Sequence, residues 1–399
     1  MDFAFTDEQL AFRDTARQFA DKELAPFAAE WDLHGTFPKD TIRRAGELGF
    51  CSLYCDEDQG GMGLSRLDAA LIFEQMAAGC TSTTAFITIH NMATWMLSRC
   101  GSEAVRQRWN GPLMSGEALA SYCLTEPGAG SDAASLKTSA RRDGDHYVLN
   151  GAKAFISGAG DTEMLVLMAR TGGPGAGGIS CFAIPADTPG VSYGRNEDKM
   201  GWKSQPTRAV ILEDVRIPAD HRIGDEGQGF KIAMATLDVF RSTVGAAALG
   251  FARSALDEGL DRARKRHLFG APLSELQMTQ GSLADMALDV DAAALLIYRA
   301  AWTKDQGAPR ITREASMAKL YATEAAQRVI DASVQIHGGD GVRVGTRVEE
   351  LYRDIRALRI YEGASEVQKV IIARQALGAR EAEEAAGSAR RRRRQAPRA

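Results

Sequence analysis

The spacing of apolar residues changes twice along the chain, and each change marks a different kind of structure. Up to about Leu119 the spacing is helical. Thr6 followed by Gln9 makes a capping box, which predicts the start of a first helix. The apolar positions that follow are Leu10, Phe12, Ala16, Phe19 and Ala20. Further helices are predicted at Pro38–Leu48 and, as two nearly buried helices, within Ala69–Met96.

The period shortens from about Ser121 to Pro218, where short apolar runs are separated by Gly, Pro, Asp and Asn. This pattern predicts a compact β module. The runs are His146–Leu149, Met164–Met168, Ile179–Ile184 and Ala209–Leu212. After Gly229, long stretches rich in Ala, Leu, Met, Arg and Glu indicate helices again. These stretches are Phe230–Arg266, Leu276–Asp305, Ile311–Ile336 and Val367–Leu377.

The order of helices, strands and helices predicts an α+β fold. We expect an N-terminal helical domain at 1–120, a middle β domain at 121–229 and a C-terminal helical bundle at 230–380. Strands and helices do not alternate, so a doubly wound sheet is not expected. A basic, disordered tail is predicted at 381–399.

The net charge of −4 hides an asymmetry. The last ten residues carry six arginines, so the rest of the chain sits at −10. An acidic body is a poor candidate for binding nucleic acid. The run Arg390–Arg394 could contact an acidic partner, but a solvated tail is the simpler interpretation.

Neither the cysteines nor the N-terminus indicate a metal site or export. The six cysteines show no metal-ligand spacing, and we expect reduced thiols and no metal. The N-terminus lacks a basic region followed by an apolar run, which argues against a signal peptide. No stretch reads as apolar for long enough to span a bilayer. We therefore expect a cytoplasmic protein with no membrane insertion.

One glycine pattern suggests a dinucleotide fingerprint and fails on context. Gly173–Gly178 satisfies G-x-G-x-x-G. That fingerprint needs a strand before it and a helix after it. Here the run Ile179–Ile184 reads as a strand. We predict a hairpin loop.

The segment Tyr122–Asp132 packs small and hydroxyl residues around Gly128 and Gly130. Glycines let a backbone approach a ligand closely, and successive N–H groups can cradle an anion such as a pyrophosphate. Thr125 and Ser131 add hydroxyl donors. Taken alone, the segment could equally be an ordinary loop between a helix and a strand.

Four shorter segments carry signals that are weak one at a time. Phe155–Gly158 ends a predicted strand, and its aromatic ring could flank an isoalloxazine or fill a core. Arg266–Gly270 offers an arginine that could hold a phosphate or stabilise a helix C-terminus. Gln335–Gly339 ends a helix in a Gly pair, which is routine capping. Tyr361–Gly363 places a glutamate before the last helix, whose N-terminus stabilises a carboxylate in any case.

Together, the five segments resemble the acyl-CoA dehydrogenase family in order and spacing, over about residues 1–380. Within the family, the chain is most similar to the group that acts on isobutyryl-CoA. The strings behind this closer resemblance are Cys80–Thr84, Ile89–Met92, Gly158–Gly160 and Gly201–Val210. The resemblance implies the three-part fold with a C-terminal four-helix bundle. It also implies a homotetramer that holds one FAD per subunit.

The resemblance assigns roles residue by residue, and Glu362 occupies the position of the catalytic glutamate. Contacts to FAD are implied for Tyr122, Cys123, Leu124, Thr125, Gly130, Ser131, Phe155, Ile156, Ser157, Ala364, Ser365 and Glu366. Contacts to the FAD of a neighbouring subunit are implied for Arg266, Phe269, Leu276, Gln277, Gln335, Ile336, His337, Gly338 and Gly339. Contacts to the acyl-CoA substrate are implied for Ser131, Asp238, Val239, Phe240, Arg241, Tyr361 and Arg374.

The sequence departs from the family pattern in a few places. Phe155 stands where medium-chain members have tryptophan, as it does in the branched-chain group. Ala364 stands where many members have Thr or Ser, which removes one hydrogen bond to FAD. Tyr361 and Gly339–Gly341 differ from the residues usual in the isobutyryl type.

The family reaction implies a role for each part of the site. Glu362 would take the α-proton while the β-hydrogen leaves as hydride to FAD, and the product would be a 2,3-enoyl-CoA. The enolate oxygen needs hydrogen bonds, which the family supplies from the backbone N–H of the glutamate and a ribityl hydroxyl of FAD. Desolvation by the acyl chain should raise the pKa of Glu362. The electrons would pass to an electron-transferring flavoprotein.

Two questions stay open at the level of sequence. Isobutyryl, 2-methylbutyryl, butyryl and cyclic acyl groups differ by a few methylenes, each worth only about 1–3 kcal/mol of discrimination. A flavin monooxygenase or oxidase on the same fold is the alternative enzyme, although such relatives often lack this glutamate. A helical scaffold that binds partners through Arg390–Arg394 is the non-enzyme alternative.

Overall fold

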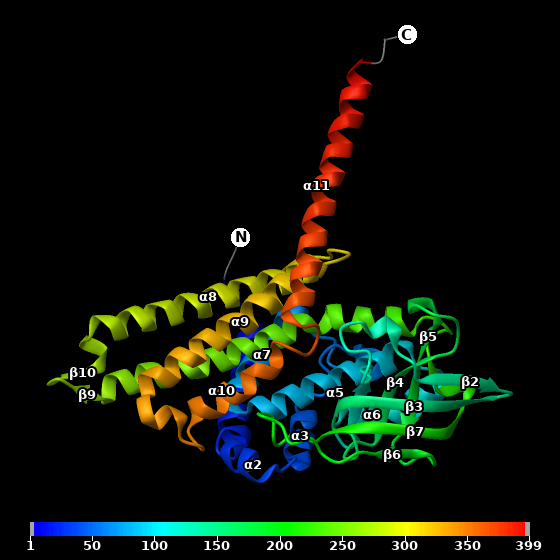
Figure 1. The fold of residues 1–399 in the computed structure, drawn as a ribbon, viewed down its shortest axis with the longest axis horizontal. Helices are drawn as coiled ribbons and strands as arrows, with labels where there is room; N and C mark the ends of the chain where they lie inside the picture. Colours follow the sequence, from blue (N-terminus) through cyan, green and yellow to red (C-terminus); the bar gives the residue numbers. More distant parts are fainter. Residues whose placement is uncertain (1–3, 396–399) are drawn as a thin grey trace.

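A computed structural model describes residues 4–395 of the protein, and the side chains of residues 4–381. The chain begins with helices, continues into a sheet and returns to helices, as the spacing of apolar residues predicts (Figure 1). The N-terminal helices are α1 (Asp7–Phe19), α2 (Ala28–His34), α3 (Lys39–Glu47), α4 (Arg66–Gly79), α5 (Thr81–Cys100) and α6 (Glu103–Met114). A π-helical turn at Ala20–Leu24 follows α1 directly.

Local chemistry explains where these helices begin. The Thr6 hydroxyl accepts a hydrogen bond from the Gln9 N–H, and the Gln9 side chain accepts one from the Thr6 N–H, so the predicted capping box is confirmed. Ser65 and Asp68 form the same reciprocal box at the start of α4. Helices α4 and α5 are buried around most of their circumference, which matches the nearly continuous apolar pattern of this segment.

The middle of the chain forms one eight-stranded sheet. Its strands are β1 (Ala120–Cys123), β2 (Ser139–Asp143), β3 (His146–Ser157), β4 (Met164–Arg170), β5 (Ile179–Pro185), β6 (Val191–Tyr193), β7 (Thr207–Pro218) and β8 (Arg222–Ile223). The order is β6-β7-β3-β2-β4-β5-β8, and β1 pairs in parallel with β4. Strands β4 and β5 are antiparallel, so the G-x-G-x-x-G segment between them is the predicted hairpin loop.

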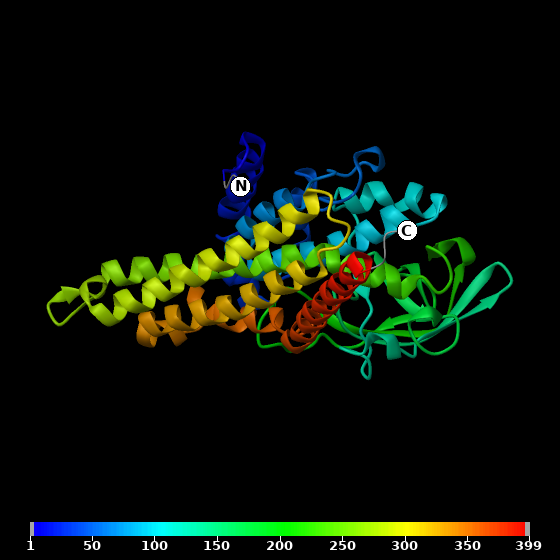
Figure 2. The same cartoon turned by 90° about the horizontal axis from the view of Figure 1, so that it is seen from above.

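Long helices return after the sheet. They are α7 (Gly229–Lys265), α8 (Gln277–Asp305), α9 (Thr312–His337), α10 (Arg347–Leu358) and α11 (Ser365–Gln395). A small hairpin of β9 (His267–Leu268) and β10 (Ala271–Pro272) joins α7 to α8. Figure 2 shows α7 and α8 side by side along the length of the molecule, with the hairpin at one end and the sheet at the other.

Helix α10 was not among the helices predicted from the sequence. Its buried apolar residues recur at helical spacing, which is a signal that could have predicted it. These residues are Val348, Leu351, Ile355 and Leu358. The omission matters because α10 leads directly into the turn that carries Glu362.

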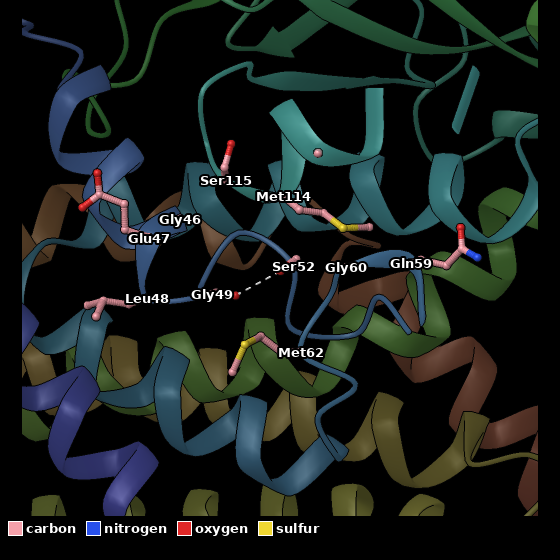
Figure 3. A pocket seen from close by; sticks show the side chains of 11 residues that line it. Gly46, Glu47, Leu48, Gly49, Ser52, Gln59, Gly60, Met62, Met114 and Ser115 are labelled. Carbon is pink, nitrogen blue, oxygen red and sulfur yellow. Dashed lines mark hydrogen bonds between the residues drawn. The ribbon is translucent and has the colours of Figure 1, made fainter. Parts of the chain in front are cut away.

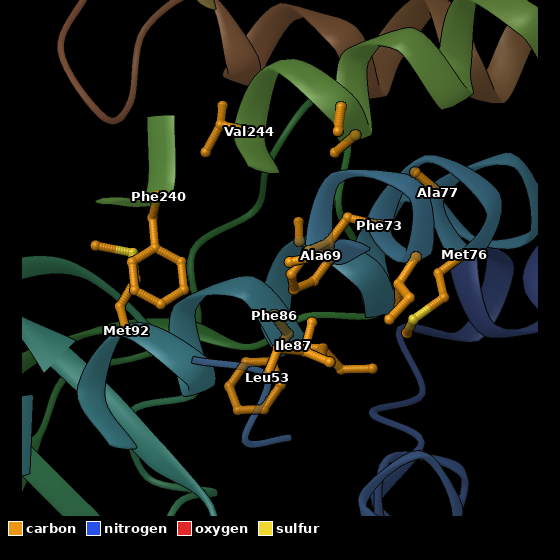
Figure 4. Packing of buried hydrophobic residues seen from close by; sticks show 14 of the residues in the cluster. Leu53, Ala69, Phe73, Met76, Ala77, Phe86, Ile87, Met92, Phe240 and Val244 are labelled. Atoms are coloured by element: carbon orange, nitrogen blue, oxygen red, sulfur yellow. The ribbon is translucent and has the colours of Figure 1, made fainter. Parts of the chain in front are cut away.

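The main core joins the first and last parts of the chain. Side chains of α4 and α5, such as Phe73 and Phe86, pack in one cluster with Phe240 and Val244 of α7 (Figure 4). A second cluster fills the sheet domain around Tyr147. Helix α7 therefore connects the N-terminal helices, the sheet and the C-terminal bundle.

Two expectations need correction, one about apolar segments of membrane-spanning length and one about the C-terminal tail. Helix α7 is long and apolar enough to cross a bilayer by length and composition, but 72% of its most apolar window is buried inside the protein, as in a core helix. The tail expected to be disordered from residue 381 instead continues α11 to Gln395, and Figure 1 shows this helix extending away from the bundle. The segment is rich in Ala, Glu and Arg, which favour helix. Residues 396–399 lie outside the described part.

Candidate active site

Glu362 lies in the turn between α10 and α11, in a backbone conformation that glutamate rarely adopts. Its φ is 56°, and that of Gly363 is 87°. A left-handed non-glycine residue persists where its surroundings enforce it, and such residues concentrate at functional sites. The Oε2 atom of Glu362 is buried and has no hydrogen-bond partner among the described residues. Oε2 is therefore not neutralised by a direct hydrogen bond or ion pair from a described residue.

The surroundings of Glu362 raise the pKa of its carboxyl toward neutrality. Burial raises its pKa to about 7, against the opposing effects of Arg241 on α7 and Lys319 on α9. A carboxylate with a pKa near neutrality can both accept a proton and release it again at physiological pH. Perturbed carboxylates of this kind concentrate at catalytic sites.

The predicted substrate residues on α7 lie in two environments. Arg241 is only 5% exposed, and its Nη1 donates to Oδ1 of Asp238 at 2.5 Å, while its Nε has no partner among the described residues. Phe240 is fully buried, with its ring edge-on to Tyr54 at a centroid distance of 5.1 Å. Val239 is partly buried against the core. The structure thus places Arg241 near Glu362 and uses Phe240 for packing.

Two tyrosines approach the same carboxylate. The charge of Glu362 adds to burial in raising the pKa of Tyr122, on β1, and of Tyr361. The Tyr122 hydroxyl has no partner among the described residues. Tyr361 packs edge-on against Trp202 at a centroid distance of 5.0 Å. Tyr122, predicted for cofactor binding, and Tyr361, predicted for substrate binding, are thus brought to Glu362.

Trp202 belongs to a string that carries the closer resemblance, but no role was predicted for it. The φ of Trp202 is 54°, and its backbone N–H donates to Oδ1 of the buried Asp354 at 2.7 Å. Asp354 lies on α10 and also accepts a hydrogen bond from Thr81 on α5. A contact between residues 152 positions apart has no local sequence signal, so it could not be predicted.

The loop after β1 is fixed to β3 by a buried ion pair that sequence analysis also missed. Lys153 is fully buried, and its Nζ donates to Glu126 Oε1 at 2.8 Å and to the Leu124 carbonyl at 3.3 Å. Glu126 also accepts from the N–H groups of Lys137 and Thr138. These contacts hold the loop that contains Thr125, Gly130 and Ser131 in one conformation.

The glycines of this loop face open space. A Cβ added at Gly128 or Gly130 would meet no heavy atom within 4 Å, although the adjacent Ala129 is buried. The prediction that a ligand approaches the backbone here is therefore sterically possible. Cys123 and Leu124 are buried beneath the loop and support it from inside the protein.

Phe155 projects from the strand that borders this loop. It has φ of 55° and is 69% exposed, at a register shift between β3 and β7, while the adjacent Ile156 is buried. The loop and strand are tied together, because the Ala154 N–H donates to the Thr125 carbonyl at 2.9 Å. The Ser157 hydroxyl accepts from Gln205 at 2.5 Å. An exposed ring beside an open glycine loop has the shape of a site for a planar ligand.

Residues just after Glu362 serve the turn itself. The Ser365 hydroxyl donates to Glu324 Oε1 at 2.5 Å, and Arg359 donates to the same oxygen at 2.9 Å. Glu366 is exposed at the start of α11. Arg374, predicted to contact substrate, is exposed further along α11 and makes no described contact with the turn. The structure does not bring it into the Glu362 group.

The remaining predicted residues gather at the opposite end of the bundle. Helix α7 has 37 residues, so its ends lie roughly 55 Å apart at 1.5 Å per residue. A cavity of about 640 Å³ lies near its C-terminal end. Its lining includes Arg266, Gln335, Ile336, His337, Gly338 and Gly339. Phe269 is 94% exposed at the tip of the hairpin, and Leu276 and Gln277 mark the start of α8. These residues therefore form a second group, away from Phe155.

A further hollow of about 470 Å³ lies on the N-terminal helical part, and Met62 and Met114 extend toward it (Figure 3). None of the predicted site residues lines it. Its walls are mainly glycine backbone and methionine, with Glu47 as the titratable group. Among the side chains of residues 4–381 there is also no cluster of three His, Cys, Asp or Glu residues suited to a metal ion.

The chain matches known proteins over most of its length. Family models described as acyl-CoA dehydrogenase N-terminal, middle and C-terminal domain match residues 6–117, 121–215 and 227–377. Mitochondrial isobutyryl-CoA dehydrogenase of Bos taurus is 49% identical over 93% of this chain and 89% of that protein.

Two solved structures share the fold. Butyryl-CoA dehydrogenase from Megasphaera elsdenii has a TM-score of 0.91 and 36% identity, covering 94% of this chain and 100% of that one. A structure titled PigA with FAD and proline has a TM-score of 0.92 and 28% identity, covering 95% and 100%. The matches favour an enzyme over a helical scaffold. The chain belongs to the acyl-CoA dehydrogenase family of oxidoreductases.

Proposed function

We propose that this protein catalyses FAD-dependent α,β-dehydrogenation of a short, branched acyl-CoA to the 2,3-enoyl-CoA, with Glu362 as the base. The observation that carries this proposal is the buried, unpartnered Oε2 of Glu362, whose pKa is raised to about 7. Sequence similarity to an isobutyryl-CoA dehydrogenase supports the acyl group.

Glu362 supplies the proton chemistry. An α C–H next to a thioester carbonyl is acidic once the developing enolate oxygen is stabilised. Glu362 accepts this proton at Oε2, which has no hydrogen-bond partner among the described residues. Arg241 and Lys319 keep part of the carboxylate ionised against the effect of burial. The backbone N–H of Glu362 is the family's donor to the thioester oxygen.

The residues present fit FAD. Bound FAD would supply the acceptor for the hydride that leaves the β-carbon. The open Gly128–Gly130 backbone suits a pyrophosphate, and the exposed Phe155 ring suits the edge of an isoalloxazine. The PigA structure, whose title names FAD, supports the same cofactor here.

The two separated groups of predicted residues support a homotetramer with shared cofactor sites. Arg266 and Gln335–Gly339 lie at the end of the bundle opposite Phe155, so they suit the FAD of a neighbouring subunit. Leu288, Leu295 and Trp302 recur every seven residues along α8 and are exposed. An apolar stripe of this kind on a long helix suits helix pairing with another copy.

The electron acceptor and the location remain proposals. We infer an electron-transferring flavoprotein as acceptor and a cytoplasmic location.

The proposal is tested by adding acyl-CoA to the purified holoenzyme without oxygen. Isobutyryl-CoA should bleach the flavin absorbance, and mass spectrometry should find an acyl-CoA that has lost two hydrogens. A kcat/KM panel with 2-methylbutyryl-, butyryl- and cyclic acyl-CoA would rank the substrates. If no acyl-CoA bleaches the flavin, the proposal is wrong. Rapid reoxidation of the reduced flavin by oxygen would favour a monooxygenase or oxidase.

A further inference from the structure

Helix α9 presents a buried lysine to the turn that carries Glu362. Lys319 is 0% exposed, and its Nζ donates to the carbonyl of Tyr361 at 3.1 Å and to that of Gly363 at 3.0 Å. One side chain thus holds the carbonyls on both sides of Glu362. A buried ammonium is stable only where its donors are satisfied, so the turn and the lysine depend on each other.

Gln368, in the first turn of α11, also binds the backbone carbonyls of this turn. Its Nε2 donates to the carbonyl of Glu362 at 3.2 Å and to that of Gly363 at 3.0 Å. The side chain is 0% exposed. A Cβ at Gly363 would lie 2.5 Å from this nitrogen, in addition to the strain of its positive φ. Three successive carbonyls, at 361, 362 and 363, are therefore held by two buried side chains, which we call the carbonyl clamp.

The clamp acts where the backbone most needs support. Glu362 has φ of 56°, and a left-handed glutamate persists only when its surroundings over-determine it. Glu324 closes the base of the turn by accepting from Arg359 and Ser365. Oε2 of the Glu362 carboxylate is buried and has no hydrogen-bond partner among the described residues.

Lys319 also contributes charge. Burial lowers its pKa to about 8, while Glu362, Glu324 and Glu366 act in the opposite direction. The titratable groups that face the Glu362 carboxylate are Arg241 from α7, Lys319 from α9, Tyr122 from β1 and Tyr361 from the turn. Two of the four are cations, and both favour the ionised carboxylate.

We propose that Lys319 is a positioning residue for the reaction, which with Gln368 fixes Glu362 in its left-handed conformation and whose charge favours the ionised base. This proposal rests on the proposed function in one respect, the role of Glu362 as the base. The two side chains share the mechanical task, but Lys319 alone adds charge. Substituting each separately therefore distinguishes geometry from electrostatics.

The experiment compares three methionine variants of the holoenzyme. Lys319→Met removes both the hydrogen bonds to the turn carbonyls and the positive charge. Gln368→Met removes only hydrogen bonds to the turn carbonyls. Lys304→Met is the matched control, because Lys304 Nζ also donates to two carbonyls of a turn, at Ala308 and Pro309, at the C-terminal end of α8. The rate of flavin reduction at saturating isobutyryl-CoA is measured across pH. Hydrogen exchange is measured over the peptide that spans 359–365.

We expect roughly 10- to 100-fold slower reduction in Lys319→Met and Gln368→Met, because a misplacement of about 1 Å is worth up to about 10²-fold. The pH at which the flavin-reduction rate is half its maximum should rise in Lys319→Met and stay unchanged in Gln368→Met. Exchange over 359–365 should rise in both. Lys304→Met should match the wild type in rate and midpoint.

Wild-type rate, midpoint and exchange in Lys319→Met would overturn the proposal, as would an equal midpoint shift in Lys304→Met. If Lys319→Met does not fold, Gln368→Met becomes the test of the carbonyl clamp. A wild-type rate of flavin reduction and wild-type hydrogen exchange in Gln368→Met would then contradict the clamp. If the wild-type flavin is not reduced by any acyl-CoA, the proposed function fails. The exchange measurement would still test the clamp in that case.

Discussion

The predicted site residues at the two ends of the C-terminal bundle differ in what surrounds them. At the Glu362 end, a short turn is fixed by hydrogen bonds with Lys319, Gln368 and Glu324 of the same chain. At the Arg266 end, the predicted residues lie around a cavity and an exposed hairpin, where Phe269 is 94% exposed.

We propose that one chain completes the Glu362 end and that a neighbouring subunit completes the Arg266 end. The geometry of the Glu362 turn is set by buried side chains of its own chain. The hairpin end presents large apolar side chains to solvent, as a surface awaiting a partner does. Changes at the first end should therefore alter chemistry, and changes at the second should alter cofactor retention and assembly.

The largest expected effect is on the rate at the Glu362 end. Glu362→Gln keeps the shape of the side chain and removes the basic oxygen. Reduction of the flavin by acyl-CoA should fall by roughly 10²–10⁴-fold, the contribution of a positioned general base. FAD content and melting temperature should stay near wild type. The exposed Glu213→Gln serves as control, and a near wild-type rate in Glu362→Gln would show that another group is the base.

How far the sequence predicts this site depends on the range of each contact. The Tyr361–Gly363 string was enough to single out Glu362 as the candidate base. Its left-handed φ and the Lys319 contact were not predictable, because Lys319 lies 42 and 44 residues away from the carbonyls it holds. The Lys153–Glu126 pair joins positions 27 residues apart and left no local signal either. The missed helix α10 is different, since its apolar spacing was present in the sequence.

A second prediction concerns the loop that faces Phe155. Lys153→Met should destabilise the protein by about 3–5 kcal/mol, because it leaves Glu126 as an uncompensated buried charge. FAD should dissociate more readily, since the loop loses its tie to β3. Thermal unfolding and flavin release by equilibrium dialysis would measure both. Lys137→Met, an exposed lysine of the same loop, is the control.

The double variant Lys153→Met/Glu126→Gln sharpens this test. It removes both charges, so part of the lost stability should return. If the double variant is no more stable than Lys153→Met, the ion pair is not what holds the loop.

The third prediction is a pH dependence at the Glu362 end. The pKa of Glu362 is raised from its ordinary value of 4.5 to about 7, so the base is lost as pH falls through 7. The kcat/KM for flavin reduction should fall about tenfold per pH unit below that midpoint, as expected for a single protonation of the free enzyme. A fall that begins only near pH 4.5 would contradict the buried environment described here.

The fourth prediction addresses the hairpin end. Arg266→Ala should weaken FAD binding and the tetramer together by several-fold, while leaving the chemical step in FAD-saturated enzyme unchanged. FAD titration and analytical ultracentrifugation would measure the two effects. Arg264→Ala is the control, since it is exposed on the last turn of α7 and does not line the cavity. Unchanged FAD affinity in Arg266→Ala would contradict the cross-subunit assignment.

The smallest effect is expected beyond both ends, in the C-terminal segment. Deleting Arg390–Ala399 should leave turnover and FAD content at the wild-type level. The match to the C-terminal domain of the family ends at residue 377, and α11 continues past this point away from the bundle (Figure 1). Removing six arginines also shifts the net charge from −4 to −10, so binding to acidic surfaces is the property that should change. Steady-state assays and cation-exchange retention of both forms would separate these outcomes, and a large loss of turnover would assign the segment a role in the active assembly.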